Sequence, residues 1–168
     1  MFILITGRPG IGKTTVLEKL AQKLSHRAYG FITKEIRQGR KRVGFDIFSP
    51  ENEFLGRLAR RDFKSNYRVG AYGVDLESFE KAVLPLLKPV SNKILIIDEI
   101  GKMELFSVAF REKLLKLKDP NCIVISSIMQ KTHPFADRIK NLEKSIICEV
   151  TLKNRDNLVN ELYLICAK

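Results

Sequence analysis

The stretch FILITGRPGIGKTT, residues 2–15, decides the fold. It begins with FILIT, a short run in which apolar and polar residues do not alternate. Such a run is typical of a strand that is buried on both faces, as in a parallel sheet. The remainder, GRPGIGKTT, fits the pattern G-x-x-x-x-G-K-[ST] and opens a helical sequence at Lys13. We therefore expect a strand, a glycine-rich loop and a helix in succession, which is the context that this motif requires.

The glycine-rich loop has the residues of a phosphate-binding site. Glycines let backbone N–H groups turn inward around a triphosphate, and the N-terminus of the following helix adds the positive end of its dipole. Lys13 can reach the β- and γ-phosphates, the Thr14 hydroxyl can bind Mg²⁺, and Thr15 is expected to reach the α-phosphate. The alternative is an ordinary glycine-rich turn. The predicted nucleotide-binding residues of the loop are Gly7, Arg8, Pro9, Gly10, Ile11, Gly12, Lys13, Thr14 and Thr15.

The rest of the chain alternates between strand-like and helix-like segments. Short runs rich in Ile and Val predict further strands at residues 94–98, 122–126 and 145–150. Apolar residues at helical spacing predict helices at residues 13–24, 75–87, 107–118, 134–142 and about 155–167. Pro85 should kink or end the second helix. Strands that alternate with helices imply a parallel α/β sheet with right-handed crossovers.

Residues 29–73 interrupt this rhythm. FITKEIR and RVGFDIF alternate like half-buried strands, and the turn-like QGRK lies between them. We therefore predict an antiparallel hairpin over residues 29–49, inserted in the α/β core, whereas residues 50–73 are rich in turn residues and match no element. The sequence has no internal repeat and no low-complexity linker, so residues 1–168 are predicted to form a single domain.

Two adjacent carboxylates end a buried run in KILIIDEIGKMELF, residues 93–106. In proteins with this phosphate-binding loop, an acid at the end of a second buried strand holds Mg²⁺, and Asp98 fits that role. Glu99 leaves the strand in another direction, so it can face the γ-phosphate and accept a proton from an attacking water. The alternative for Glu99 is a solvent-exposed turn residue. The predicted catalytic residues are Lys13 and Glu99, and the predicted metal ligands are Thr14 and Asp98.

Other polar residues also follow predicted strands, at the edge of a parallel sheet where ligands bind. A hydroxyl of Ser126 or Ser127 can sense the γ-phosphate or orient the water, and a plain strand-end serine is the alternative. Asn154 or Arg155 can touch the base or ribose, and Arg155 can stack on a base without reading its identity. The alternative for Asn154 is a helix cap.

Further charged residues have less certain positions relative to the phosphates. Lys102 can contact phosphate or neutralise a neighbouring glutamate, and Glu104 is expected to be a structural partner near a helix start. An arginine that meets the γ-phosphate accelerates hydrolysis by about 10³–10⁵ where this has been measured. The sequence does not choose among the candidates Arg8, Arg68, Arg138 and Arg155.

The formal net charge of +11 favours anionic partners such as nucleotides, nucleic acid or membrane surfaces. The basic cluster RQGRKR, residues 37–42, can bind nucleic acid weakly or form a solvated hairpin tip. No apolar run is long enough to span a membrane, and the N-terminus lacks the features of a signal peptide. We therefore expect a cytoplasmic monomer without a membrane partner. The three cysteines form no CxxC pair and are expected to be reduced core residues.

Several segments together resemble a known family. GRPGIGKTT, YGFITKEIR with RVGFDI, YGVDLESFE and above all DEIGKMEL look like the small P-loop nucleoside-triphosphatases, which include thermophilic members and a human cancer-related relative. The resemblance spans nearly the whole chain. It implies a three-layer, RecA-like P-loop NTPase fold and slow, Mg²⁺-dependent hydrolysis of ATP, GTP, CTP and UTP to the diphosphate and phosphate. Its P-loop falls on residues 7–15, and its second acidic motif falls on Asp98 and Glu99.

Two other functions remain compatible with the sequence. A nucleotide or nucleoside kinase shares the P-loop but needs a pocket for a phosphate acceptor, which the hairpin and residues 50–73 can supply. A nucleic-acid-associated module that uses ATP as a switch would bind RNA or DNA with an affinity that falls steeply with salt.

Overall fold

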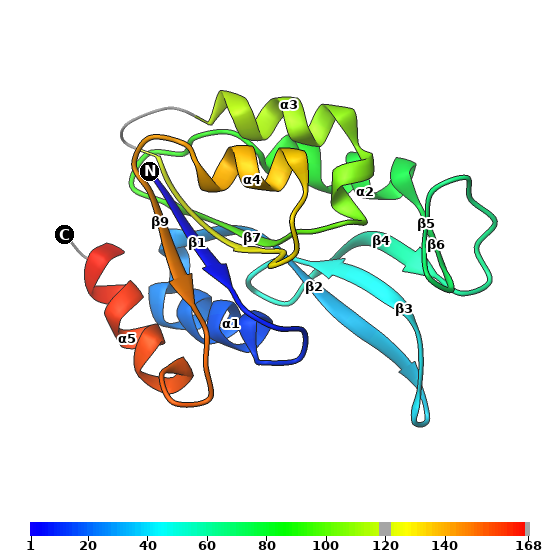
Figure 1. Cartoon of the computed structure of the whole chain (residues 1–168), viewed down its shortest axis with the longest axis horizontal. Coiled ribbons are helices and arrows are strands. Elements are labelled where there is room, and N and C mark those ends of the chain that lie inside the picture. The colour runs from blue at the N-terminus through cyan, green and yellow to red at the C-terminus, as the bar shows by residue number, and fades with distance from the viewer. Residues whose placement is uncertain (118–121, 167–168) are drawn as a thin grey trace.

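The computed structural model describes residues 1–117 and 122–166 of the chain (Figure 1). One twisted sheet lies between two layers of helices. The final residues of two expected helices, 118 and 167, lie outside the described residues. None of the helices in the described part of the chain is both long enough and apolar enough to cross a membrane.

Every strand predicted from a buried apolar run is confirmed. These strands are parallel and pair in the order β2-β7-β8-β1-β9. Their bounds are β1 Phe2–Thr6, β2 Ala28–Gln38, β7 Ile94–Ile100, β8 Ile123–Ile128 and β9 Ser145–Glu149. The strand β8 separates β1 from β7, so the α/β and RecA-like expectations are confirmed.

The predicted hairpin is also confirmed, but it is not an isolated insertion. Its first strand is β2, which pairs with β7 on one side and antiparallel with β3 on the other. The segment without a sequence assignment continues this antiparallel half, in the order β2-β3-β4-β6-β5. The added strands are β3 Lys41–Phe48, β4 Phe54–Arg60, β5 Arg68–Val69 and β6 Tyr72–Val74.

The helices form two layers (Figure 1). On one face of the sheet lie α1 (Lys13–Leu24) and α5 (Arg155–Cys166). On the other lie α2 (Leu76–Val83), α3 (Val108–Lys116) and α4 (Pro134–Lys140). Short 3₁₀ helices follow three elements, namely η1 (Ser25–Arg27), η2 (Leu84–Leu86) and η3 (Glu104–Phe106). As expected, α2 ends before Pro85, which lies in η2.

A hydrophobic core fills each side of the sheet. On the α2–α3–α4 side, the fully buried rings of Phe31, Phe79 and Phe110 pack edge to face, with centroids 5.3–6.3 Å apart. On the other side, Leu17 and Leu20 of α1 pack into a cluster with the isoleucines of β1, β7 and β8. These contacts fix α1 against the sheet, so the carboxyl ends of the three strands face the start of α1.

Candidate active site

The P-loop joins β1 to α1 through backbone conformations that favour glycine. Gly7, Gly10 and Gly12 have φ angles of +144°, +76° and +108°, which side chains other than glycine rarely adopt. Gly12 occupies the N-cap position of α1 and provides no side chain to cap the helix. The first-turn N–H groups of α1 are therefore available to an anion, together with the positive end of the helix dipole.

Lys13 folds back over this loop. Its Nζ atom donates a hydrogen bond to the Gly7 carbonyl oxygen at 3.1 Å and lies 3.5 Å from that of Arg8. The ammonium group is thus held above the curved backbone, where a bound phosphate would lie. Arg8 itself is exposed on the loop.

Thr14 and Asp98, predicted from sequence as metal ligands, are in direct contact. Thr14 Oγ1 donates to Asp98 Oδ2 at 2.7 Å, and Ser127 Oγ donates to Asp98 Oδ1. Asp98 is only 1% exposed. Burial raises its pKa, against the hydrogen bonds from Ser127 and Thr14. Hydroxyl and carboxylate oxygens are the hard ligands that Mg²⁺ prefers, and the ion usually keeps several waters as well.

Few protein ligands surround this position. Across residues 1–117 and 122–166, no three His, Cys, Asp or Glu side chains are grouped as a metal-binding cluster. A site with one carboxylate and one hydroxyl suits an ion that is also held by substrate phosphates, because Mg²⁺ sites commonly combine one or two carboxylates with phosphate oxygens.

Glu99 lies within β7 and is partly buried. A cis peptide bond joins it to Asp98. Burial raises the pKa of the Glu99 carboxyl, the charge of Asp98 raises it further, and Lys13 opposes the rise. A carboxylate with a raised pKa is a stronger proton acceptor than an exposed glutamate.

The two strand-end serines are fully buried at the end of β8. Ser127 bonds Asp98, whereas the Ser126 hydroxyl donates to the carbonyl oxygen of Ser127 at 2.7 Å. Ser127 therefore links β8 to the acid of β7 and holds one of its oxygens. Neither hydroxyl is a plain exposed end of a strand.

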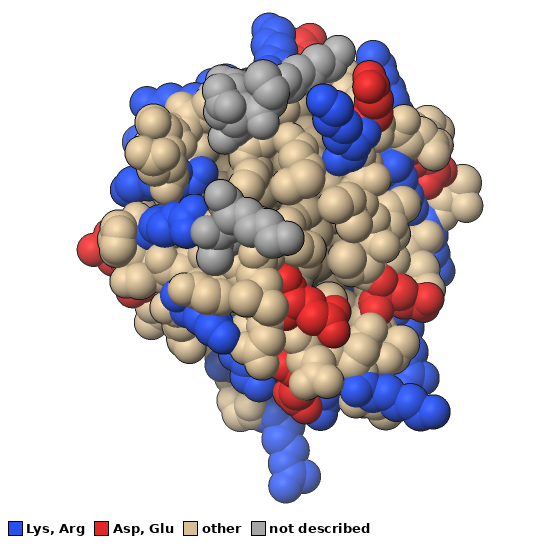
Figure 2. Space-filling view, turned by 90° about the vertical axis from the view of Figure 1, so that its left-hand side faces the viewer, with Lys and Arg blue, Asp and Glu red and all other residues tan. Residues whose placement is uncertain are grey.

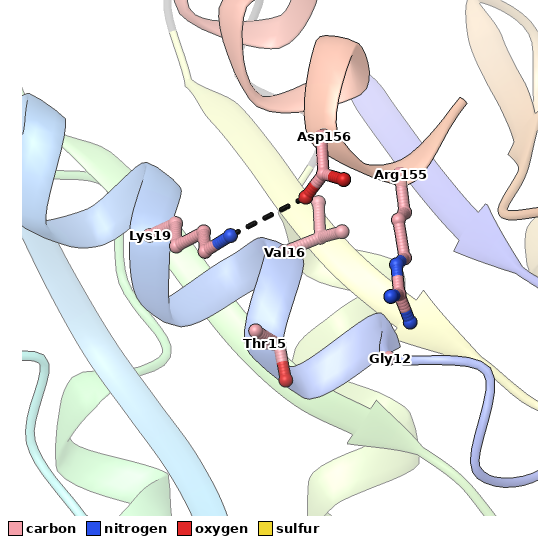
Figure 3. A pocket seen from close by; sticks show the side chains of 6 residues that line it. All are labelled: Gly12, Thr15, Val16, Lys19, Arg155 and Asp156. Atoms are coloured by element: carbon pink, nitrogen blue, oxygen red, sulfur yellow. Dashed lines mark hydrogen bonds and ion pairs between the residues drawn. The ribbon is translucent and has the colours of Figure 1, made fainter. Parts of the chain in front are cut away.

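Arg155 reaches the P-loop from the start of α5. A cavity of about 180 Å³ is lined by Gly12, Thr15, Val16, Lys19, Arg155 and Asp156. In Figure 3 the Arg155 side chain runs toward Gly12, whereas Asp156 turns toward Lys19. A Cβ atom built on Gly12 would lie 3.9 Å from Arg155 Cδ. The Lys19 and Asp156 charges form an exposed ion pair at 3.4 Å.

Asn154 organises the loop that carries Arg155. Its Nδ2 atom donates to the Glu149 carbonyl oxygen at 2.8 Å, and its Oδ1 atom accepts from the Thr151 N–H at 2.8 Å. The carboxamide is therefore engaged within the loop between β9 and α5. The backbone carbonyl of Asn154 accepts the Leu158 N–H of α5.

The remaining candidates are farther from the P-loop contacts. Lys102 and Arg138 are exposed, and the Arg68 guanidinium donates to the Ala71 carbonyl oxygen at 3.1 Å.

The sequence reading missed the importance of Gly101. A Cβ atom there would lie 2.4 Å from Glu99 Oε1 and 3.0 Å from Glu104 Oε2. The glycine therefore leaves space for two acidic side chains. Its place between two glutamates in the sequence was the available signal.

Comparisons with known proteins agree with this arrangement. The family described as NTPase matches residues 2–163. The chain belongs to the NTPase family. The nucleoside-triphosphatase THEP1 of Thermotoga maritima is 47% identical over 96% of this chain and 93% of its own length.

Two solved structures of relatives have the same fold as this member of the NTPase family. The crystal structure of THEP1 from the hyperthermophile Aquifex aeolicus superposes with a TM-score of 0.90 at 36% identity, covering all of both chains. The solution structure of a human cancer-related nucleoside triphosphatase gives a TM-score of 0.83 at 34% identity, covering 99% of this chain and 97% of the other. The expected family resemblance is thus confirmed over the full fold.

Proposed function

We propose that this chain hydrolyses nucleoside 5′-triphosphates, ATP, GTP, CTP and UTP, to the diphosphate and phosphate with Mg²⁺ as cofactor. The observation that carries the proposal is the contact between Thr14 and Asp98, with Glu99 next in the chain and Lys13 over the loop. This single strand end combines phosphate binding, metal ligation and a candidate base. The printed names of the relatives, nucleoside-triphosphatases, support the same reaction class.

Substrate binding is assigned to the P-loop. Backbone N–H groups of residues 7–15 surround the phosphates, and Lys13 contacts the β- and γ-phosphate oxygens. Thr14 and Asp98 hold Mg²⁺, while Ser127 keeps the Asp98 carboxylate in place. When bound, the ion neutralises charge that develops on the phosphate oxygens.

The chemical step is assigned to Glu99. Its carboxylate accepts a proton from a water molecule while the water oxygen forms a bond to the γ-phosphorus. The bond from the γ-phosphorus to the bridging oxygen breaks, and the diphosphate leaves with that oxygen. Lys13 stabilises the negative charge on the departing group.

Base recognition is assigned to the cavity beside the P-loop. Arg155 borders this cavity with Thr15, and a guanidinium can stack on any base. Stacking without a matching set of hydrogen bonds gives broad base specificity. Asn154 contributes by holding the loop in which Arg155 begins α5.

Phosphate release from each of the four triphosphates, measured with and without Mg²⁺, tests this function. Hydrolysis of all four in the presence of Mg²⁺, and none after chelation with EDTA, is expected. Activity that appears only after a nucleoside or monophosphate is added would assign the chain to the kinases instead.

A kinase is the second candidate because of one observation. A surface hollow of about 420 Å³ lies in the segment expected to form an acceptor pocket, and its lining residues are Lys64, Ser65, Asn66 and Arg68. The acceptor arms of the same assay separate this function from hydrolysis.

Nucleic-acid binding has weaker support. In the basic hairpin, Arg37 and Arg42 both pair with Glu35 at 2.6 Å, and Arg60 pairs with Asp46 at 2.6 Å. The face in Figure 2 has its Lys and Arg side chains spread over the surface rather than gathered in one patch. Binding that falls steeply with salt would support such a partner.

A further inference from the structure

Glu104 is a buried acid without a role in the proposed reaction. It begins η3, and only 3% of its surface is exposed. None of the ion pairs among the described residues includes it. Burial of a carboxyl group without a cation is costly unless hydrogen bonds compensate, so its contacts are informative.

The Glu104 carboxyl shares a space with the proposed base. A Cβ atom on Gly101 would come within 3.0 Å of Glu104 Oε2 and within 2.4 Å of Glu99 Oε1. Both carboxyl groups therefore converge on the side of Gly101 where other residues carry a side chain. The backbone fixes this meeting point, because the Leu105 N–H donates to the Gly101 carbonyl oxygen at 3.0 Å.

The surroundings of Glu104 favour its neutral form. Burial raises its pKa well above the ordinary value, and the charge of Glu99 raises it further, against the backbone N–H groups of Glu104 and Gly101. A protonated carboxyl donates a hydrogen bond, whereas a carboxylate only accepts. A neutral Glu104 is thus the natural partner of an ionised Glu99.

We propose that Glu104 is a positioning residue that fixes the direction of the Glu99 carboxylate through a hydrogen bond beside Gly101. The inference rests on the proposed role of Glu99 as the base. Misplacement of a reacting group by about 1 Å can reduce a rate by about 100-fold. Glu104 therefore acts on the rate of the chemical step and not on substrate binding.

Two substitutions of similar volume separate a hydrogen bond from simple space filling. Glu104→Gln keeps a donor, so its kcat is expected to remain within about threefold of the wild type. Glu104→Met fills the space without a donor, and its kcat is expected to fall by about 10- to 100-fold. KM is expected to change by less than about twofold in both variants, and thermal unfolding verifies that each is folded.

Glu80→Met is the matched control. Glu80 lies on α2 and accepts a hydrogen bond from Ser107 at 2.6 Å, outside the Glu99 contact. Its kcat is expected to be unchanged. An unaltered kcat in Glu104→Met, an equal loss in Glu104→Gln, or a change confined to KM would overturn the inference.

Glu99→Gln in the same assay separates the two proposals. If Glu99→Gln is inactive while Glu104→Met is fully active, the positioning role fails and the base assignment stands. If Glu99→Gln hydrolyses at the wild-type rate, the base assignment fails, and the positioning role falls with it.

Discussion

Gly101 shows how one missing side chain shapes the candidate active site. Its neighbours Glu99 and Glu104 both occupy the volume that a Cβ atom would need. No positive φ requires a glycine at this position. The requirement is therefore steric, and it concerns two acidic groups rather than the backbone.

Gly101→Ala is accordingly expected to lower kcat by about 10-fold or more while leaving nucleotide affinity unchanged. The new methyl group displaces the Glu99 carboxylate but is far from the P-loop contacts in the chain. Steady-state kinetics and equilibrium nucleotide binding measure the two quantities. Gly39→Ala, at a hairpin tip with open space around it, is the control, and equal losses of kcat in the two variants would contradict the steric explanation.

The buried Glu104 also predicts a pH dependence of stability. Its folded-state pKa is raised, so the unfolded chain loses this proton at lower pH than the folded protein does. The stability that the protonated group preserves is present below the unfolded pKa and is lost as pH rises through the folded pKa. Glu104→Gln removes this loss.

Denaturant unfolding of wild type and Glu104→Gln at about pH 4 and pH 8 checks this sign. The variant is expected to gain stability relative to the wild type at the higher pH. A relative gain at the lower pH would show that the Glu104 pKa is lowered rather than raised.

The loop between β9 and α5 is the element that links the sheet to the cavity. Asn154 joins Glu149 to Thr151 within it, and Arg155 follows at once. The sequence offered a cap or a nucleotide contact for Asn154, but not a bond across its own loop. Such bonds depend on the loop conformation, which residue types alone do not specify.

Asn154→Ala is expected to raise KM for ATP by about 3- to 10-fold, because it releases the loop that carries Arg155. Arg155→Ala should have an equal or larger effect on KM. In the double variant, the two effects should not add, because Asn154 acts through Arg155. Fully additive effects would show that Asn154 contributes independently.

At the scale of the whole molecule, the sequence predicted the parallel half of the sheet well. Its strands are buried on both faces, so their apolar runs are unambiguous. The antiparallel half was harder, because β4 contains Gly56, whose missing side chain makes room for Ser78 and Ala82 of α2. The contacts of Ser127 and Gly101 also escaped prediction, because they join residues through the fold.

Nucleotide binding should stabilise the entire fold, because the site joins β1, β7, β8 and α1. With Mg²⁺ and ATP at about 100 times Kd, the expected gain is about 2.7 kcal/mol. Thermal unfolding with and without nucleotide measures it. Lys13→Ala should lose most of the gain, and an undiminished gain in that variant would place the nucleotide elsewhere.

The central claim is that Glu99 activates water at a site where other residues bind the nucleotide. The direct measurement is Glu99→Gln, assayed for single-turnover phosphate release and for ATP affinity on the same preparation. The claim predicts a loss of at least about 100-fold in the rate with the affinity retained. Hydrolysis at the wild-type rate, with ATP bound normally, would contradict it.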